Sequence, residues 1–213
     1  MKLDTRKIYD ITPTVSPKLA VFPGDTRYEN SYLMSFEKGD HLSLSKIHTT
    51  VHLGAHADAP SHYHANGVSI EARDLNLYVG CAQVITVAEK RGHRIGLEDV
   101  KTEIQAPRVL FKTNSFPNPD HWNNDFMALS IELIQNLHQN GVRLVGIDTP
   151  SVDLADDKVL EVHNEIYRSD LAILEGIVLT HVPDGIYELM ALPLKLKGAE
   201  ASPVRAVLVE TLR

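Results

Sequence analysis

The sequence is poor in sulfur chemistry, with one cysteine, Cys81, among its 213 residues. A single cysteine cannot form an internal disulfide, and it excludes metal sites built from several thiolates. Any metal would therefore be held mainly by His, Asp and Glu. We expect a cytoplasmic protein, because a lone thiol suits a reducing compartment and Met1–Lys7 lacks the apolar region of a secretory signal.

Long apolar runs and an excess of positive charge are also missing. The longest apolar stretches, such as Leu171–Leu179, fall well short of the roughly 20 residues that a membrane span requires. Acidic residues outnumber basic ones by 28 to 21, and the resulting net charge of −7 repels polyanions. We therefore expect neither a membrane nor a nucleic acid as a partner.

The remaining composition is that of an ordinary globular protein. Hydrophobic residues make up 43% of the chain and charged residues 23%, which excludes a disordered or fibrous protein. No linker or internal repeat divides the sequence, and its length suits one large domain. We therefore expect a single domain over residues 1–213.

Short apolar and β-branched runs alternate with helical patterns. Ser130 is a good N-cap for a helix that Gly141 ends, and a second helix is expected over Asp157–Arg168. Extended segments are expected at Ile8–Ile11, Ser43–Val51, Cys81–Val87, Val109–Thr113, Val142–Ile147, Ile173–Val178, Leu189–Leu194 and Ala206–Leu212. This order of strands and helices predicts an α/β domain.

Three segments predict no regular element. Arg27–Asp40 is polar without clear periodicity, and the charged segment Glu89–Glu103 is expected at the surface. Asn114–Asp125 is rich in Asn, Asp and Pro and predicts a long loop that carries the only tryptophan, Trp122. Asp148 follows a strand end, and we expect a structural or supporting role for it.

Histidine is the residue type in excess. The sequence has eleven histidines, and six of them fall within residues 41–64. From His52 onward, His56, Asp58 and His62 place a possible metal ligand at nearly every second position, with mostly small residues between them. Imidazole and carboxylate groups are common zinc ligands. The pattern therefore predicts a metal site.

Regular secondary structure does not bring these side chains together. A straight strand rises roughly 3.3 Å per residue and would separate His52 from Asp58 by about 20 Å, whereas two ligand atoms on one zinc lie about 3.3 Å apart. A helix is disfavoured by Gly54 and Pro60. We therefore expect a curled loop at a strand end, hinged at Gly54, that folds His52, His56 and Asp58 around one point.

The alternative is a surface or core segment that happens to contain histidines. For any single histidine this interpretation is the better one. We apply it to the three histidines that flank the regular spacing, His41, His48 and His64. The regular spacing on a backbone rich in Gly, Ala and Pro favours the metal site for the others.

Residues His52–His62 read H-L-G-A-H-A-D-A-P-S-H. They resemble the motif H-x-G-T-H-x-D-x-P-x-H of the bacterial kynurenine formamidase and cyclase family, whose members are metal-dependent hydrolases. Ala55 stands where the family usually has Thr, and the spacing is unaltered. The resemblance continues through Phe22–Thr26, Gly146–Asp153, the interval from His163 to Glu175, Ala191–Leu194 and Ala201–Val207.

The resemblance implies two zinc ions per subunit. His52, His56 and Asp58 would bind one ion, and Asp58 would bridge to a second ion held also by His163 and Glu175. Glu175 is notable without the resemblance, because a carboxylate in an apolar strand is costly to bury unless it is paired or metal-bound. Manganese is also compatible with this ligand set.

The reaction implied by the resemblance is hydrolysis of N-formyl-L-kynurenine to L-kynurenine and formate. Water activated by the metal would attack the formyl carbon of this aryl formamide, and His62 would pass a proton to the leaving arylamine. The implied fold is the swivelling β/β/α fold of the family. The implied assembly is a homodimer or a larger homo-oligomer.

One position departs from the family pattern. Phe22 stands immediately before Pro23-Gly24-Asp25, where the family's formamidases usually carry a substrate-contacting Trp. Phe keeps an aromatic face but lacks the indole N–H donor. One alternative is therefore a sibling hydrolase that opens a cyclic amide such as isatin. An alternative of another class is a metal-binding protein without enzymatic activity.

Overall fold

The computed structural model describes residues 6–211, so that Met1–Thr5 and Leu212–Arg213 lie outside it. Most of the segment read for a secretory signal is thus outside the described residues. The strands of the main sheet are β1 (Ile8–Asp10), β4 (His56–Asp58), β5 (Val79–Thr86), β7 (Arg108–Lys112), β9 (Leu144–Ile147), β10 (Ala172–Glu175), β11 (Gly185–Met190), β12 (Ala201–Pro203) and β13 (Val207–Glu210).

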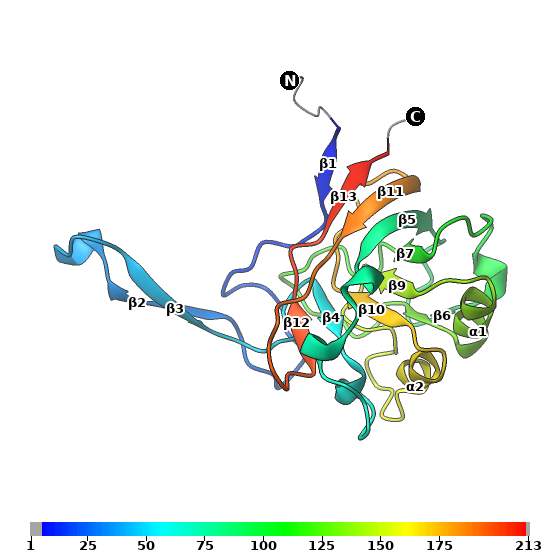
Figure 1. Cartoon of the computed structure of the whole chain (residues 1–213), viewed down its shortest axis with the longest axis horizontal. Coiled ribbons are helices and arrows are strands. Elements are labelled where there is room, and N and C mark those ends of the chain that lie inside the picture. The colour runs from blue at the N-terminus through cyan, green and yellow to red at the C-terminus, as the bar shows by residue number, and fades with distance from the viewer. Residues whose placement is uncertain (1–5, 212–213) are drawn as a thin grey trace.

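Within residues 6–211 these nine strands form one mixed sheet in the order β1-β13-β11-β5-β7-β9-β10-β4-β12 (Figure 1). Strands β5, β7, β9 and β10 are parallel to one another, and the flanking pairs are antiparallel. The described residues also form two α-helices and five short 3-10 helices: α1 (Ile131–Gln139), α2 (Glu161–Arg168), η1 (Phe36–Lys38), η2 (Pro60–His62), η3 (Ile70–Ala72), η4 (Leu75–Leu77) and η5 (Leu97–Asp99). The expected single α/β domain is confirmed.

The side chains of alternate residues in the central strands belong to two different apolar clusters. Phe111 and Ile173 pack on one side with buried residues of α1 and α2. Leu110 and Leu174, each next to one of these residues in its strand, pack in the other cluster with Ala57 of β4. Because successive strand residues point to opposite faces, the sheet separates the two clusters. In residues 6–211 we find no helix that combines the length and apolarity needed to span a membrane.

The first expected helix is confirmed at both ends. The side chain of Ser130 accepts a hydrogen bond from the backbone N–H of Leu133 at 3.2 Å, which satisfies one free donor of the first turn. Gly141 follows the helix with a φ of 80°, a left-handed conformation that glycine adopts without steric cost.

The second helix begins later than Asp157, where the sequence predicts it. Asp157 instead accepts a hydrogen bond from the backbone N–H of Leu160 at 3.0 Å. Leu160 has a left-handed φ of 55°, so a continuous helix cannot run from Asp157 into α2. The carboxylate of Asp153 then accepts from the N–H groups of Val162 and His163, both at 3.1 Å. A distant carboxylate, and not Asp157, thus caps α2.

Three expected strands have other bounds in the structure. β10 stops at Glu175 instead of Val178, because Gly176 turns the chain with a φ of 63°. The strand expected over Leu189–Leu194 is found earlier in the chain as β11, which ends at Met190; the N–H of Ala191 still binds the carbonyl oxygen of Tyr78, just before β5. β13 is shorter than the expected Ala206–Leu212, and Leu212 lies outside the described residues.

The segment Glu89–Glu103 is only partly at the surface. It contains the short strand β6 (Arg94–Ile95), which pairs in parallel with β8 (Ala128–Leu129). Ile95 is fully buried in this pairing. The expected loop Asn114–Asp125 contains no helix or strand, as predicted.

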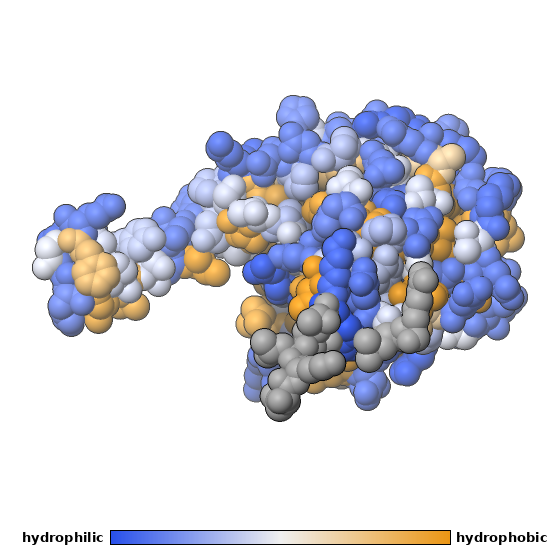
Figure 2. Space-filling model, turned by 90° about the horizontal axis from the view of Figure 1, so that it is seen from above, coloured by the Kyte–Doolittle hydropathy of each residue, from blue (hydrophilic) through white to orange (hydrophobic). Residues whose placement is uncertain are grey.

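A hairpin of β2 (Glu29–Met34) and β3 (Leu44–His48) projects from the main body, and we call it the arm (Figure 1). The sequence predicts extended chain over Ser43–Val51 but no element over Arg27–Asp40. All but one of the eleven strand residues are exposed, so no buried face imposes a period of two on β2. The space-filling view shows apolar side chains on the arm (Figure 2).

Candidate active site

Ligand-type side chains gather where β4 lies beside β10. His56 pairs directly with Glu175 in the antiparallel register, and Asp58 follows on the same side of β4. The sequence predicts a curled loop here, and this expectation is wrong for His56–Asp58, which form a strand. Two ligands spaced by two residues can share one strand face. His52 alone needs the turn, which Gly54 provides with a φ of 55°.

The turn after His52 and the end of β10 are in unusually close contact. A Cβ atom on Gly176 would lie 2.1 Å from the carbonyl oxygen of Gly54. Both glycines have left-handed backbone conformations, at φ values of 55° and 63°. The two glycines therefore let the segment that carries His52 approach the strand that carries Glu175.

The side chains converge on Asp58. Asp58 Oδ1 lies 3.1 Å from His52 Nδ1 and 3.5 Å from His56 Nε2, and Asp58 Oδ2 lies 3.6 Å from His163 Nε2. The carboxylate of Glu175 lies between the other two histidines, 3.2 Å from His56 Nε2 and 3.7 Å from His163 Nε2. These separations are close to the roughly 3.3 Å expected between two ligands of one zinc ion.

Several buried polar atoms of this cluster make no hydrogen bond. They are both carboxylate oxygens of Asp58, Nε2 of His52 and Nε2 of His163. Asp58 is 1% exposed, so bulk water does not reach its carboxylate. Buried polar groups in native proteins nearly always have partners, and unpaired carboxylate and imidazole atoms facing one another are a donor set that suits a divalent cation. The residues present therefore fit a metal.

Backbone and carboxylate oxygens orient two of the histidines. Nδ1 of His56 lies 2.8 Å from the carbonyl oxygen of Gly54, and Nδ1 of His163 lies 2.8 Å from Asp153 Oδ2. Each contact places the proton on Nδ1 and leaves Nε2 toward the cluster. Arg94 in turn binds Asp153 at 2.8 Å. Asp153 is an addition to the expected site, and its one sequence signal is its place at the end of Gly146–Asp153.

The carboxylates dominate the electrostatics. Burial alone would lower the pKa of His56, but contact with Glu175 and the charge of Asp58 raise it to about 9. The pKa of His163 is also opposed by burial and is raised to about 10 by Asp153 and Asp58. The pKa of Asp58 is held well below its usual range, against the effect of burial, by His163 and His52. The cluster thus strongly favours positive charge.

His62 lies on η2 beside the cluster. Its ring centroid is 4.2 Å from that of His52 and 5.9 Å from that of His163. Burial, together with the charges of His52 and His163, lowers the pKa of His62 against the effect of Asp58. The ligand atoms of Asp58, His62 and His163 also lie within 4.8 Å of one another, as do those of His52, His56 and Asp58. This geometry suits His62 as an acid/base group and also as a ligand.

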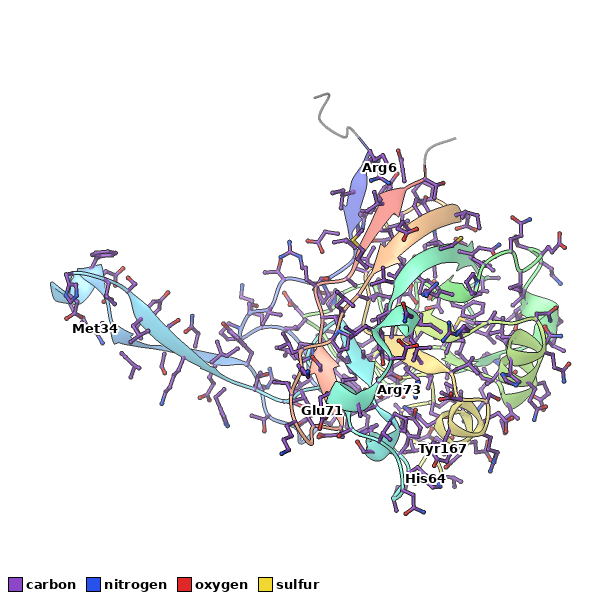
Figure 3. The ribbon with its side chains drawn as sticks, viewed as in Figure 1. Arg6, Met34, His64, Glu71, Arg73 and Tyr167 are labelled. Carbon is purple, nitrogen blue, oxygen red and sulfur yellow. The ribbon has the colours of Figure 1, made fainter. Side chains whose placement is uncertain are left out.

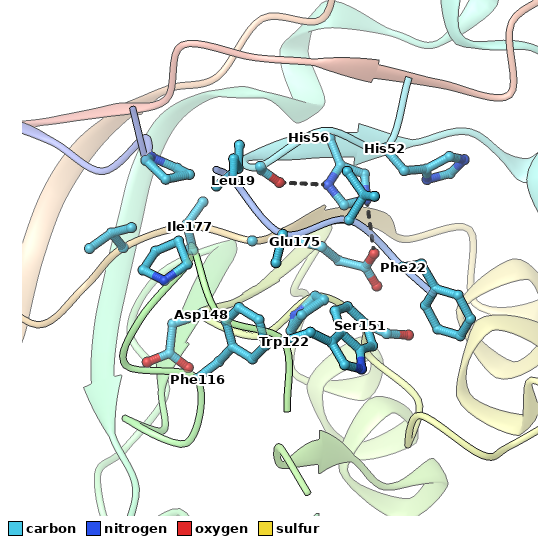
Figure 4. A pocket seen from close by; sticks show the side chains of 18 of the residues that line it. Leu19, Phe22, His52, His56, Phe116, Trp122, Asp148, Ser151, Glu175 and Ile177 are labelled. Atoms are coloured by element: carbon cyan, nitrogen blue, oxygen red, sulfur yellow. Dashed lines mark hydrogen bonds and ion pairs between the residues drawn. The ribbon is translucent and has the colours of Figure 1, made fainter. Parts of the chain in front are cut away.

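A cavity of about 500 Å³ opens onto the cluster. His52, His56, His62, His163 and Glu175 line one part of it. Figure 4 shows Glu175 pointing toward His56 while Phe22, Phe116 and Trp122 occupy another part of the lining. Cavities of this size hold small organic ligands. Phe22, predicted to contact substrate, is thus in the same cavity as the cluster.

Asp148 also lines the cavity, but its bonds are structural. Its carboxylate accepts hydrogen bonds from the N–H groups of Thr113 and Asn114 at 3.0 Å and from the Thr113 hydroxyl at 2.6 Å. Burial raises the pKa of Asp148, although these donors oppose the shift. The contacts anchor the start of the Asn114–Asp125 loop, which agrees with the structural role expected.

The three flanking histidines lie elsewhere. His64 stacks on Tyr167 with ring centroids 3.8 Å apart (Figure 3). His41 and His48 are exposed in or near the arm. None of the three belongs to a ligand-type group within the described range 6–211. That they are ordinary histidines therefore stays our interpretation.

Comparison with known proteins places the chain in a family. The family model described as "Putative cyclase" matches residues 9–154. A kynurenine formamidase from Maricaulis maris (strain MCS10) is 41% identical over 206 residues, which are 96% of this chain and 98% of that protein. The chain belongs to the cyclase family. It is a homologue of a kynurenine formamidase, and the resemblance seen in the sequence is confirmed.

Solved structures share this cyclase fold. One, described as a potential metal-dependent hydrolase with cyclase activity, is 27% identical with a TM-score of 0.84, over 98% of this chain and 100% of that one. Isatin hydrolase A from Labrenzia aggregata, bound to benzyl benzoate, has a TM-score of 0.80 at 22% identity, over 97% of this chain and 94% of that one. The second likeness concerns the fold alone.

Proposed function

We propose that the protein hydrolyses N-formyl-L-kynurenine to L-kynurenine and formate. The observation that carries this proposal is a set of buried, unpaired ligand atoms beside a cavity with an aromatic lining. The 41% identity to a kynurenine formamidase supports the substrate. An aryl formamide needs both features, because its amide must be activated while its ring is held.

Two divalent ions per subunit form part of the proposal. His52, His56 and Asp58 would hold one ion, and Asp58, His163 and Glu175 would hold the other. Bound Zn²⁺ would supply a nucleophilic water at neutral pH and would polarise the formyl oxygen. Mn²⁺ suits the same oxygen and nitrogen donors. Unpaired atoms on Asp58 and His163 support this assignment.

The chain itself supplies proton transfer and positioning. His62 stands beside the ligand cluster and lines the cavity, where it can deliver a proton to the amine nitrogen as the C–N bond breaks. The resulting arylamine leaves without a negative charge. Phe22 would contact the ring, and Asp153 would keep Nε2 of His163 directed at the cluster.

A substrate comparison tests the proposal. Metal-loaded protein should release formate from N-formyl-L-kynurenine faster than it opens isatin. Isatin is the competing substrate because an isatin hydrolase shares the fold and Phe22 departs from the family's usual Trp. Faster turnover of isatin would favour the sibling hydrolase, and inactivity on both substrates would reject the proposal.

A second experiment separates catalysis from metal binding alone. The substitution His62→Ala should reduce formate release strongly while bound metal is retained. His64→Ala is the matched control, because His64 stacks on Tyr167 away from the cluster. Unchanged hydrolysis in His62→Ala would remove this residue from the mechanism. Metal loss in that variant would indicate that His62 is a ligand.

We also propose a homodimer in which the arm packs on a second copy of the chain. The exposed fraction is 61% for Leu33, 69% for Phe36 and 63% for Ile47. A two-stranded hairpin is marginally stable in water without packing against another element, and the body of the same subunit does not cover this one (Figure 1). Symmetric pairing of identical chains would bury both arms at once.

Light scattering after gel filtration tests the dimer. The unmodified protein should have the mass of two chains or more, and Leu33→Ser combined with Phe36→Ser should lower it to one. Lys38→Ser, on the same part of the arm, is the control. A single-chain mass for the unmodified protein would contradict the proposal.

The proposed compartment is the cytoplasm, which the single cysteine suits.

A further inference from the structure

Trp122 is the only tryptophan of the chain, and it lines the cavity. It lies in the Asn114–Asp125 loop, far in sequence from the segment around Phe22. The two rings meet edge to face, with centroids 5.2 Å apart and planes at 73°. Phe22, the residue before Pro23, carries no indole, but Trp122 supplies one to the same cavity (Figure 4).

The indole of Trp122 is held in place by neighbours of its own loop region. Phe116 and Phe126 contact it edge to face, at centroid distances of 5.9 Å and 5.8 Å. Its Nε1–H donates to Asn124 Oδ1 at 2.7 Å. Because the N–H is already bonded, the group offered to a ligand is the ring surface and not a donor.

We propose that Trp122 determines the preference for an aromatic leaving group, by packing against the ring of the substrate together with Phe22. This inference rests on the proposed hydrolysis of an aryl formamide. The histidine cluster and the two aromatic side chains line the same cavity. If the amide of a substrate lies at the histidine cluster, a ring attached to its nitrogen would lie in the space lined by Phe22 and Trp122.

Kinetics with matched variants test this role. In Trp122→Ala, KM for N-phenylformamide should rise about tenfold, which corresponds to an aromatic contact together with its buried area, while kcat changes less. The ringless substrate N-methylformamide should show almost no change in KM. Trp122→Phe should restore most of the affinity. His121→Ala, an exposed neighbour in the same loop, is the control.

Fluorescence gives a second readout that needs no turnover. Since Trp122 is the only tryptophan, the indole emission of the metal-loaded protein reports on this residue alone. Benzamide, which carries a ring, should change the emission saturably, and acetamide should not. No saturable change with benzamide would overturn the inference.

The two proposals fail in different ways. If the unmodified protein releases formate from N-phenylformamide and Trp122→Ala leaves KM unchanged, the role of Trp122 is wrong and the proposed function stands. If the unmodified protein releases no formate, the proposed function is wrong. The benzamide titration then still decides whether Trp122 contacts an aromatic ligand.

Discussion

The two sides of the cavity are built differently. The cluster side comes from β4, β10 and α2, where strand register and a capped helix fix His56, Glu175 and His163. The aromatic side comes from loops, where Phe22 and Trp122 contact each other edge to face. Strands and helices therefore position the groups proposed for the reaction, and loops position the groups proposed for substrate choice.

This difference makes the two sides unequally easy to change. Moving a ligand atom requires a change in the sheet, because Asp58 and Glu175 sit on paired strands. Moving an aromatic ring requires only a change in a loop. In this chain the indole is placed at residue 122 while position 22 carries Phe. Variants on each side should thus affect different measurable quantities.

The largest effect is expected for Asp58→Asn. The amide cannot balance the charge of two cations, so bound metal and formate release should both be lost, with turnover reduced by about a thousandfold or more. Elemental analysis and formate release on the same sample provide the measurement. Full metal content in this variant would show that Asp58 is not a ligand.

Gly176→Ala should disturb the contact between the two ligand-bearing segments. Its Cβ would collide with Gly54 O, and its φ is left-handed, so the free energy of unfolding should fall by about 2 to 5 kcal/mol. Gly198→Ala is the matched control, with a φ of 76° and open space, and should cost about 1 to 2 kcal/mol. Urea unfolding measures both. Equal losses would contradict the importance of the close contact.

Asp153→Asn tests the support of His163. An amide at this position orients the imidazole less well, so metal affinity should fall about 10- to 100-fold. Competition with a chelator of known affinity measures the change. Asp156→Asn, an exposed neighbour, should leave the affinity unaltered. Affinity retained in Asp153→Asn would show that the carboxylate charge of Asp153 is not needed to hold His163.

Asp148→Asn should act on the aromatic side, with the smallest effect. The NH2 of the new amide would face the backbone N–H of Asn114, and two donors cannot pair. One buried hydrogen bond is therefore lost, and the start of the loop is held less firmly. KM for an aryl formamide should rise about fivefold, while metal content stays constant. Asp120→Asn, exposed in the same loop, is the control. Loss of metal in Asp148→Asn would break the separation between the two sides.

The cluster was largely predictable because its signals are local. The spacing of His52, His56 and Asp58 and the carboxylate of Glu175 in an apolar strand each stand out in the sequence itself. The strand at His56–Asp58 was not predicted, because only His52 needs the turn at Gly54. Each of these signals lies within a single segment, so it can be recognised without knowing which segments meet in the fold.

Other features depend on contacts between distant segments. Asp153 caps α2 and binds His163 across ten positions, and Trp122 meets Phe22 across a hundred. Apart from the place of Asp153 at the end of Gly146–Asp153, no local pattern marks either residue. Strand β2 of the arm was missed for another reason, because it buries no face in its own subunit. The polar and apolar residues of β2 therefore do not show the period of two that marks a half-buried strand.

Formate release before and after metal removal shows whether the histidine cluster hydrolyses the substrate with a bound metal. Metal-loaded protein should hydrolyse N-formyl-L-kynurenine, lose this activity when a chelator removes the metal, and regain it on addition of Zn²⁺. Elemental analysis of the same samples should show about two ions per chain in the active form. Undiminished turnover by protein without bound metal would contradict the account.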